Sequence, residues 1–211
     1  MKSIEKADLK NNTKVLIRAD LDVPIENGKI QDTYRLDKLL PTLSFIKSKN
    51  AKIILMGHIG RPGGEYKEEL STKNLKPYFD KVLGENNYKL LENLRFDNRE
   101  KENSEDYARE IVTKTNADVY VNESFATSHR EHTSIVSVPR LLPSYAGIRF
   151  MKEISTLKNL LDNPERPLVS VIGGAKVETK KSAVDKFLEI SDHVLIGGKI
   201  GIDWDSSKPK N

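Results

Sequence analysis

The feature that most constrains the fold of this chain is the regular alternation of short apolar runs with amphipathic stretches. The apolar runs have the length of strands, whereas the stretches between them repeat their apolar residues at helical spacing. The expected strands lie at 15–17, 53–56, 88–91, 118–121, 168–172 and 193–196, and the expected helices at 36–46, 75–83, 104–112, 151–161 and 183–190. Strands that alternate with helices predict an α/β fold with a doubly wound, Rossmann-like parallel sheet.

Several local signals add detail to this prediction. Asn27-Gly28 lies between two short apolar segments and predicts a β-hairpin. Pro41 falls inside the first helical pattern and is expected to kink that helix. Ser104 is expected to cap the N-terminus of one helix, and Gly84 is expected to end another.

Pro164 and Pro167 mark a boundary after the helix expected at 151–161. We therefore predict an N-terminal lobe at residues 1–150, a connecting helix at 151–165 and the beginning of a second, incomplete α/β lobe at 166–211. The second lobe offers two expected strands and one helix between them, whereas a parallel sheet needs cover on both faces. We expect the segment 167–198 to be mobile, to dock on the first lobe or to pair with another chain.

The composition excludes several classes of chemistry. The chain has no cysteine, which rules out disulfides, thiolate metal sites and cysteine nucleophiles. The net charge of +4 arises from interspersed charges of both signs and is weak evidence for nucleic-acid binding. The N-terminus lacks the apolar segment of a signal peptide, and no apolar run has the length of a membrane span, so a cytoplasmic location is expected.

Polar and basic side chains follow the expected strands of the first lobe. Because ligands of parallel α/β sheets bind outside the carboxyl ends of the strands, we expect these side chains to gather at one rim. They are Asp20, Asp22, Arg35, His58, Arg61, Asn93, Arg95, Asn122, His129 and Arg130. Guanidinium groups bind phosphate and carboxylate as a bidentate fork, so the rim suits a small, multiply anionic ligand. Each arginine by itself is also typical of a solvated surface residue, and each histidine of a structural one.

A second candidate site is the glycine turn at 173–176, between an expected strand and an expected helix. Such a turn lets the backbone approach phosphate, and the helix N-terminus supplies amide donors. The spacing is not that of a Walker A loop. Lys176 and Lys180 share a helical face if the helix starts early, where their like charges repel unless an anion lies between them. A tight turn with two solvated lysines is the alternative interpretation.

Six segments, in order along nearly the whole chain, resemble motifs of the phosphoglycerate kinase family. Residues 18–24 look like R-V-D-x-N-V-P, and residues 57–62 are similar to S-H-L-G-R-P. Residues 91–96 reproduce L-E-N-L-R-F, and residues 121–132 resemble V-N-D-A-F-G-T-A-H-R-A-H. Residues 172–177 resemble L-G-G-A-K-V, and residues 195–198 match L-I-G-G. Six matches in register are far more specific than any one of them.

The resemblance implies a two-lobed kinase that transfers phosphate reversibly between 1,3-bisphosphoglycerate and Mg-ADP, giving 3-phosphoglycerate and Mg-ATP. Carried over residue by residue, its 3-phosphoglycerate site would comprise Asp20, Asp22, Arg35, His58, Arg61, Arg95 and Arg130. The catalytic residues would be Arg35 and Lys180, and the positions near the nucleotide would be Gly174, Lys176, Lys180 and Gly198. No metal ligand is expected within this chain. The expected partners are these small molecules, without nucleic acid or membrane, and the full-length form is expected to be a monomer.

The sequence departs from the family pattern at three places. Asp22 stands where the family usually has Asn, and Lys199 where it usually has a third Gly. The adenine pocket, the later glycine-rich loop and the acidic metal ligand of the nucleotide lobe have no counterpart before Asn211. We therefore expect the chain by itself to bind but not to turn over. Two alternatives stay open: a stand-alone lobe that binds a phosphorylated acid, and one half of a split kinase.

Overall fold

The computed structural model describes residues 2–174 and 181–203 of the chain. The chain divides into two compact units, Met1–Glu153 and Ile154–Asn211. The first unit holds a five-stranded sheet and a small hairpin, and the second holds a separate two-stranded sheet. The functional boundaries predicted at 150/151 and 165/166 remain a prediction.

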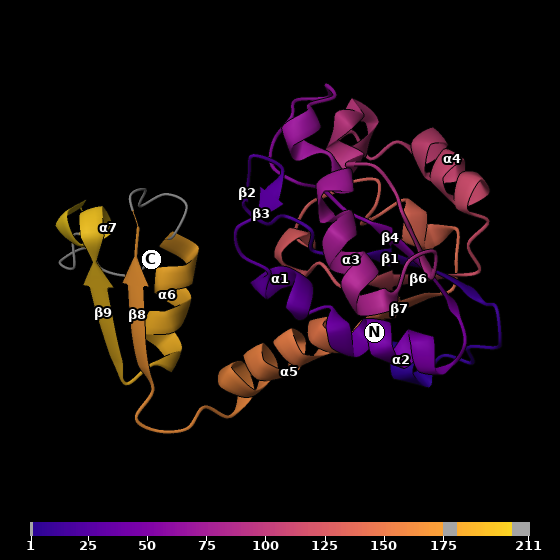
Figure 1. The fold of residues 1–211 in the computed structure, drawn as a ribbon. Coiled ribbons are helices and arrows are strands. Elements are labelled where there is room, and N and C mark those ends of the chain that lie inside the picture. The colour runs from indigo at the N-terminus through magenta and orange to yellow at the C-terminus, as the bar shows by residue number, and fades with distance from the viewer. Residues whose placement is uncertain (1, 175–180, 204–211) are drawn as a thin grey trace. The chain divides into compact units, whose positions relative to one another are not determined.

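The main sheet of the first unit is parallel throughout (Figure 1). Its strands are β1 (Lys14–Arg18), β4 (Lys52–Met56), β5 (Tyr88–Leu90), β6 (Val119–Asn122) and β7 (Ser144–Ala146). Their spatial order is β5-β4-β1-β6-β7, so the chain builds outward from β1 on one side and then returns to build on the other. This order confirms the predicted doubly wound α/β fold.

Each face of this sheet carries its own apolar core, because successive side chains of a strand point to opposite faces. Val15, Ile17 and Leu55 belong to the core that includes residues of α2 (Leu40–Ser48) and α3 (Lys76–Leu83). Leu16, Ile54 and Met56 belong to the core that includes residues of α4 (Glu105–Thr115). Helical cover on both faces is what a parallel sheet requires.

The hairpin predicted at Asn27-Gly28 is confirmed. Strand β2 (Ile25–Glu26) pairs antiparallel with β3 (Lys29–Ile30), with Ile25 opposite Ile30. Asn27 and Gly28 adopt φ angles of 50° and 71°, the left-handed region that a two-residue hairpin turn of this kind demands.

The prediction of one continuous helix kinked at Pro41 is wrong. The segment instead contains two helices, α1 (Tyr34–Asp37) and α2, and Pro41 lies in the first turn of α2. Proline lacks an amide hydrogen, which the first turn of a helix does not need, so it starts a helix there without loss. The apolar spacing runs through the break because both helices face the same core.

The predicted caps are confirmed, whereas one strand was missed. The Ser104 side chain accepts a hydrogen bond from the Tyr107 amide at 3.3 Å, and Gly84, with φ of 88°, ends α3.

Strand β7 has three residues and follows directly after Pro143, so it carries too short a pattern to be seen in the sequence. It pairs with β6 and completes the sheet.

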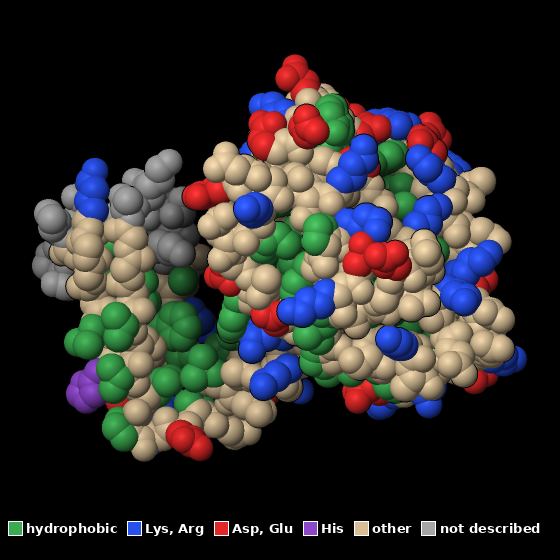
Figure 2. Space-filling model, viewed as in Figure 1, with side chains coloured by type: hydrophobic (Ala, Val, Ile, Leu, Met, Phe, Trp, Pro, Cys, Tyr) green, Lys and Arg blue, Asp and Glu red, His purple; other side chains and the backbone are tan. Residues whose placement is uncertain are grey.

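The second unit contains a parallel pair, β8 (Val169–Gly173) and β9 (His193–Gly197), with α6 (Lys181–Ile190) between them in sequence. Helix α5 (Ile148–Asp162) leads into this unit, and α7 (Gly198–Asp203) follows β9; α7 was not predicted. Figure 1 shows α6 beside β8. Figure 2 shows hydrophobic side chains gathered on the surface of this unit. The loose tail predicted from residue 203 lies almost wholly outside the described residues.

None of the helices in the described ranges combines the length and the apolar character needed to span a lipid bilayer.

Candidate anion-binding rim

The candidate site lies where β4, β1 and β6 end together. Arg18, the last residue of β1, is in register with Met56 at the end of β4 and with Asn122 at the end of β6. The chain reverses its direction of building between β1 and β6, which is the point where open α/β sheets bind ligands. The segments that carry the predicted site residues leave the sheet at this edge.

Arg35 and Asp20 face each other across the rim. Asp20 follows β1, and Arg35 is the second residue of α1. Arg35 Nη1 donates to Asp20 Oδ1 at 3.1 Å, and both side chains remain partly open to solvent. The ion pair orients Arg35, and within the part of the chain that the structure describes the other guanidinium nitrogens form no hydrogen bond, so they can bind a ligand.

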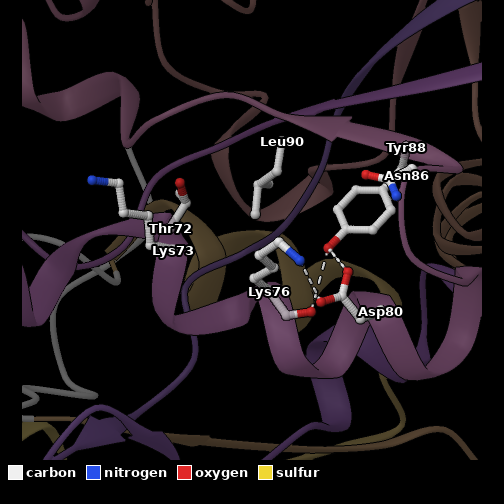
Figure 3. Close-up of a pocket in the computed structure, with 7 residues that line it drawn as sticks. All are labelled: Thr72, Lys73, Lys76, Asp80, Asn86, Tyr88 and Leu90. Atoms are coloured by element: carbon white, nitrogen blue, oxygen red, sulfur yellow. Dashed lines mark hydrogen bonds and ion pairs between the residues drawn. The ribbon is translucent and has the colours of Figure 1, made fainter.

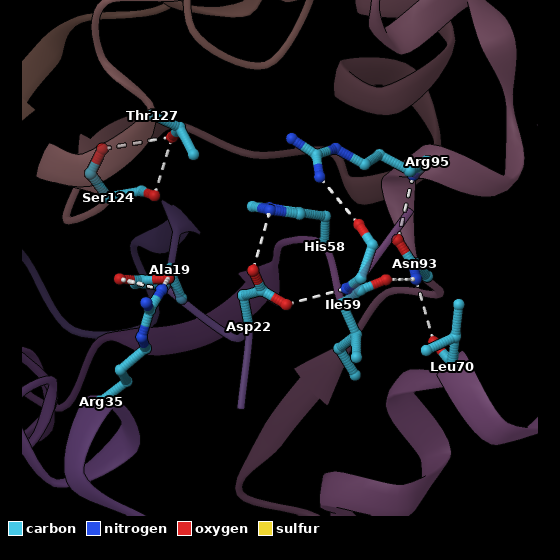
Figure 4. Close-up of polar contacts among 12 residues, drawn as sticks. Ala19, Asp22, Arg35, His58, Ile59, Leu70, Asn93, Arg95, Ser124 and Thr127 are labelled. Atoms are coloured by element: carbon cyan, nitrogen blue, oxygen red, sulfur yellow. Dashed lines mark hydrogen bonds and ion pairs between the residues drawn. The ribbon is translucent and has the colours of Figure 1, made fainter. Parts of the chain in front are cut away.

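Asp22 connects two of the loops at the rim (Figure 4). Its Oδ1 accepts a hydrogen bond from the Gly60 amide at 2.8 Å, and its Oδ2 lies 3.7 Å from Nε2 of His58. The carboxylate at this position therefore holds the loop after β4 against the end of β1. Through this contact, Asp22 shapes the site that carries His58.

Arg95 reaches the same place from the 3-10 helix η4 (Leu94–Phe96). Its Nη1 donates to the Gly60 carbonyl at 2.8 Å, but its buried Nε has no hydrogen-bond partner within the described residues. Burial lowers the pKa of Arg95, and the charges of Arg130 and Arg18 add to that effect. A buried guanidinium with an unpaired donor beside other cations is an environment that favours a bound anion.

Arg61 and Arg130 are both exposed. No hydrogen bond or ion pair of either side chain occurs among residues 2–174 and 181–203. Arg130 is nevertheless close enough to lower the pKa values of His58 and Arg95. These two arginines are free to turn toward a ligand, as expected of side chains that bind only when it arrives.

The loops of the rim are held by polar side chains. Asn93 donates to the Ile59 carbonyl at 2.8 Å and to the Leu70 carbonyl at 2.9 Å, so it fastens neighbouring loops (Figure 4). After β6, the Ser124 amide donates to Asn122 Oδ1 at 2.9 Å. Asn93 and Asn122 thus act in this structure as loop supports.

Sequence reasoning missed the charged network beneath the rim. Arg18 is fully buried and contacts His58, while its Nε donates to Ser134 Oγ at 2.9 Å. Ser134 Oγ in turn donates to the buried Glu100 at 2.6 Å. Neither Arg18 nor Glu100 was assigned a role from the sequence, because partners 116 residues apart, such as Arg18 and Ser134, leave no local signal.

The glycine turn of the second unit is described only in part. Gly174 and Gly198 lie directly after β8 and β9, and the Ile200 amide donates to the Gly174 carbonyl at 3.2 Å. A Cβ atom on Gly198, whose φ is 66°, would approach the Gly174 oxygen to 3.2 Å. The two chain segments therefore approach closely here. Lys176 and Lys180 lie outside the described residues.

A separate pocket of the first unit lies at α3 and β5 (Figure 3). Its lining residues are Thr72, Lys73, Lys76, Asp80, Asn86, Tyr88 and Leu90. Lys76 forms an ion pair with Asp80, and the Tyr88 hydroxyl donates to Asp80 at 2.9 Å. These charged groups already satisfy one another, and none of the predicted site residues lines the pocket, so the rim remains the candidate site.

The fold and the rim together define a class: an α/β protein whose parallel-sheet lobe presents a basic, partly unpaired rim to a small anion. A family model described as "Phosphoglycerate kinase" matches residues 4–89 and 83–205. The chain belongs to the phosphoglycerate kinase family, as its motifs predicted.

Individual relatives agree with this assignment. The phosphoglycerate kinase of Leptospira biflexa is 42% identical over 220 residues, covering 92% of this chain and 54% of that protein. The structure of phosphoglycerate kinase from Coxiella burnetii matches with a TM-score of 0.83 and 31% identity, covering 93% of this chain and 54% of the other. That from Pyrococcus horikoshii OT3 matches with a TM-score of 0.80 and 28% identity, covering 96% of this chain and 56% of the other. The chain spans about half the length of the curated relatives it matches.

Proposed function

We propose that the first unit binds 3-phosphoglycerate at the rim and that the chain serves the reversible phosphoryl transfer between 1,3-bisphosphoglycerate and ADP. The observation that carries the proposal is the meeting of Arg35, His58 and Arg95 at one sheet edge, from three different segments. Arg95 contributes a buried N–H that lacks a partner within the described chain. A phosphate or carboxylate oxygen would satisfy that donor.

The residue types at the rim suit this reaction. In the direction that consumes ATP the nucleophile is the substrate carboxylate, which is ionised at neutral pH, so no general base is needed. Catalysis then consists of positioning the reactants and neutralising charge on the moving phosphoryl group. Arg35 is proposed to supply positive charge from the first unit.

The Mg-nucleotide is the second substrate in this proposal. Gly174 and Gly198 fit a role near its phosphates, because they lie at the carboxyl ends of β8 and β9. Neither residue has a side chain that would keep a phosphate away from the backbone amides. Lys176 and Lys180 are proposed to join them on the strength of the family motif alone. Lys180 would act on the transferred phosphoryl group.

Calorimetry with 3-phosphoglycerate tests the rim directly. Arg35→Ala, Arg61→Ala and Arg130→Ala should each weaken binding by about 2–5 kcal/mol, because each removes one charged partner of the anion. Arg109→Ala is the matched control, since Arg109 is an exposed arginine of α4 that pairs with Glu105. Unchanged affinity in all three rim variants would contradict the site, as would an equal loss in the control.

Asp22→Asn tests how this chain uses its unusual carboxylate. The amide introduced by this substitution would keep an oxygen for the Gly60 amide while removing a negative charge that repels the ligand. We expect affinity for 3-phosphoglycerate to be kept or to rise. A tenfold loss would show that the carboxylate contributes to binding.

A second candidate function is a binding unit that turns over only with a partner chain. It is favoured by the apolar surface of the β8–β9 sheet, where Val171 and Leu195 are exposed. A coupled assay tests this second candidate: the purified 211-residue chain should bind 3-phosphoglycerate without ATP-dependent turnover until a partner chain is added. Measurable turnover would contradict this second candidate.

A further inference from the structure

Arg18 is held in a single orientation beneath the rim. It is fully buried at the end of β1, and each of its guanidinium nitrogens has a partner. Nε donates to Ser134 Oγ at 2.9 Å, Nη1 donates to the Ala19 carbonyl at 2.6 Å, and Nη2 lies 2.9 Å from Nδ1 of His58. This arginine therefore has no freedom to turn toward a ligand.

The contact with Arg18 decides where His58 carries its proton. Arginine has only donors and keeps its charge in proteins, so the facing Nδ1 must be the acceptor. An imidazole that accepts at Nδ1 is neutral and carries its proton on Nε2. In this structure Nε2 is the nitrogen on the side of Asp22, 3.7 Å from its carboxylate (Figure 4).

Glu100 provides the counter-charge that makes a buried arginine tolerable. Its Oε1 accepts from the Ser134 hydroxyl at 2.6 Å, and its Oε2 accepts from the Ser134 amide at 3.0 Å. Ser134 thus accepts from Arg18 and donates to Glu100, so one hydroxyl connects the two charges. Without Glu100, the buried guanidinium would lose the carboxylate to which the Ser134 hydroxyl links it.

The other groups around His58, apart from Asp22, also favour the neutral imidazole. Those that face it are Arg18 from β1, Asp22 after β1, Arg95 from η4, and Arg130 and His132 after β6. All except Asp22 are cations or become cations on protonation, and together with burial they lower the pKa of His58 to about 2. The imidazole accordingly remains neutral throughout the physiological pH range.

We propose that Arg18, anchored by Ser134 and Glu100, is a positioning residue that holds His58 as the neutral tautomer protonated on Nε2. The rim then contains a permanent N–H donor whose hydrogen bond to an anionic ligand does not depend on pH. The tautomer follows from the geometry alone, whereas its use toward 3-phosphoglycerate rests on the proposed function. His58 in this arrangement binds and orients, and it transfers no proton.

The tautomer can be measured without any ligand. Long-range proton–nitrogen NMR spectra of the full chain, labelled at histidine, report which ring nitrogen is protonated. The His58 signal is identified by its loss in His58→Gln, and free imidazole in the sample confirms each pH step. We expect a bare Nδ1 and a protonated Nε2 from about pH 5.5 to 8, since an unperturbed histidine titrates near 6.5. A proton on Nδ1, a mixture of tautomers or titration of the ring within this range would overturn the proposal.

Two variants test the part played by Arg18. Arg18→Met removes both the donor and the charge, so the NMR pattern of His58 should become mixed or begin to titrate. Arg18→Lys keeps a charged donor on the same strand and should preserve more of the wild-type pattern. An unchanged pattern in Arg18→Met would overturn the assignment. If Arg18→Met does not fold, the wild-type spectrum still decides the tautomer.

Binding measurements then test the use of the donor. His58→Gln places an amide N–H at about the reach of Nε2, whereas His58→Asn places it at the reach of Nδ1. Affinity for 3-phosphoglycerate should stay within a few fold in the first variant and fall about tenfold in the second, the effect of one lost hydrogen bond. The ratio of wild-type to His58→Gln affinity should be equal at about pH 5.5 and 7.5, on either side of the usual histidine pKa, which cancels titration of the ligand's phosphate. A ratio that changes with pH would overturn the proposal. Absence of binding by the wild type would contradict the proposed function alone, since the NMR result stands by itself.

Discussion

The two sheets of this chain are built from similar parallel strands but are covered very differently. In the first unit, β1 and β4 bury side chains on both faces, against α2 and α3 on one face and α4 on the other. In the second unit, Ile172 is buried while Val171 is 76% exposed and Leu195, on β9, is 57% exposed. Similar apolar strand sequences therefore reach different degrees of burial, because cover comes from tertiary packing and is not contained in the strand itself.

The charged groups differ in the same way. The first unit buries Arg18, Glu100 and Glu123 and satisfies them through hydrogen bonds. In the second unit, the ion pairs Arg166–Asp192 and Lys186–Glu189 lie at the surface. Ion pairs at the surface contribute little to the free energy of unfolding, whereas removal of one partner from a buried network lowers it strongly. Within the described residues, the first unit thus has both the closed core and the polar network that a fixed binding site needs.

The largest expected difference is in amide hydrogen exchange. The amides of β1 and β4 should exchange only through openings that cost about 5 kcal/mol or more of free energy, as in the core of a stable domain. Those of β8 and β9 should exchange much faster, because an isolated pair of strands with one open face is marginal in water. Mass spectrometry of the exchanged chain at low concentration resolves the two regions. Equal, slow exchange of both sheets in a monomer would contradict this difference.

A matched pair of leucine substitutions measures the same contrast by stability. Leu55 lies fully buried in β4, whereas Leu195 lies largely exposed in β9. Leu55→Ala should lower the free energy of unfolding by about 2–5 kcal/mol, because it leaves a cavity in the core. Leu195→Ala should change it by less than about 0.5 kcal/mol, as for other exposed positions. Urea unfolding followed by circular dichroism gives both values.

The outcome for Leu195 is the more informative of the two. A loss comparable to that of Leu55→Ala would show that the exposed face of β8–β9 is covered in solution. Sedimentation at several concentrations would then distinguish cover by the chain itself from cover by a second copy, because only the latter depends on concentration.

The fold could be predicted from the sequence wherever a periodic pattern was long or a turn residue was decisive. Local sequence was enough to predict three features, namely strand β4, the helix cap at Ser104 and the hairpin at Asn27-Gly28. Strand β7 could not be found in this way, since its three residues become a strand only by pairing with β6. The break between α1 and α2 was misjudged because apolar spacing records which face is buried and not whether the helix is continuous.

The order and direction of the strands were enough to predict which residues gather at the rim, but not the contacts that hold them there. Parallel strands place the residues after them at one edge, and Arg35, His58 and Arg95 lie at this edge with the two aspartates, while their role in binding remains a prediction. The roles of Arg18 and Glu100 depend on contacts between segments 34 to 116 residues apart, which a single sequence does not reveal. The same holds for Asn93, whose amide proved to support loops.

The smallest of the expected differences concerns acid. Burial and neighbouring cations lower the pKa of His58 from 6.5 to about 2. Below pH 6.5, His58 therefore binds a proton in the unfolded chain but not in the folded first unit. Stability is therefore lost as pH falls below about 6.5, by at most about 1.4 kcal/mol per pH unit from this residue. In the second unit, the lowered pKa of Asp192 matters only below its usual value of 3.8, outside this window.

Comparison of the wild type with His58→Gln isolates this effect between about pH 6.5 and 5, just below the usual histidine pKa. Glutamine has no titrating proton, so the variant should lose less stability per pH unit than the wild type. The lowered pKa of His132 and the raised pKa values of Glu100 and Glu123 also contribute to the pH dependence, but they are present in both proteins and largely cancel in the difference. Any constant stability cost of losing the Arg18 contact shifts the whole curve without changing its slope. Urea unfolding at several pH values gives the two slopes, and equal slopes would show that His58 is protonated as readily in the folded chain as in the unfolded one.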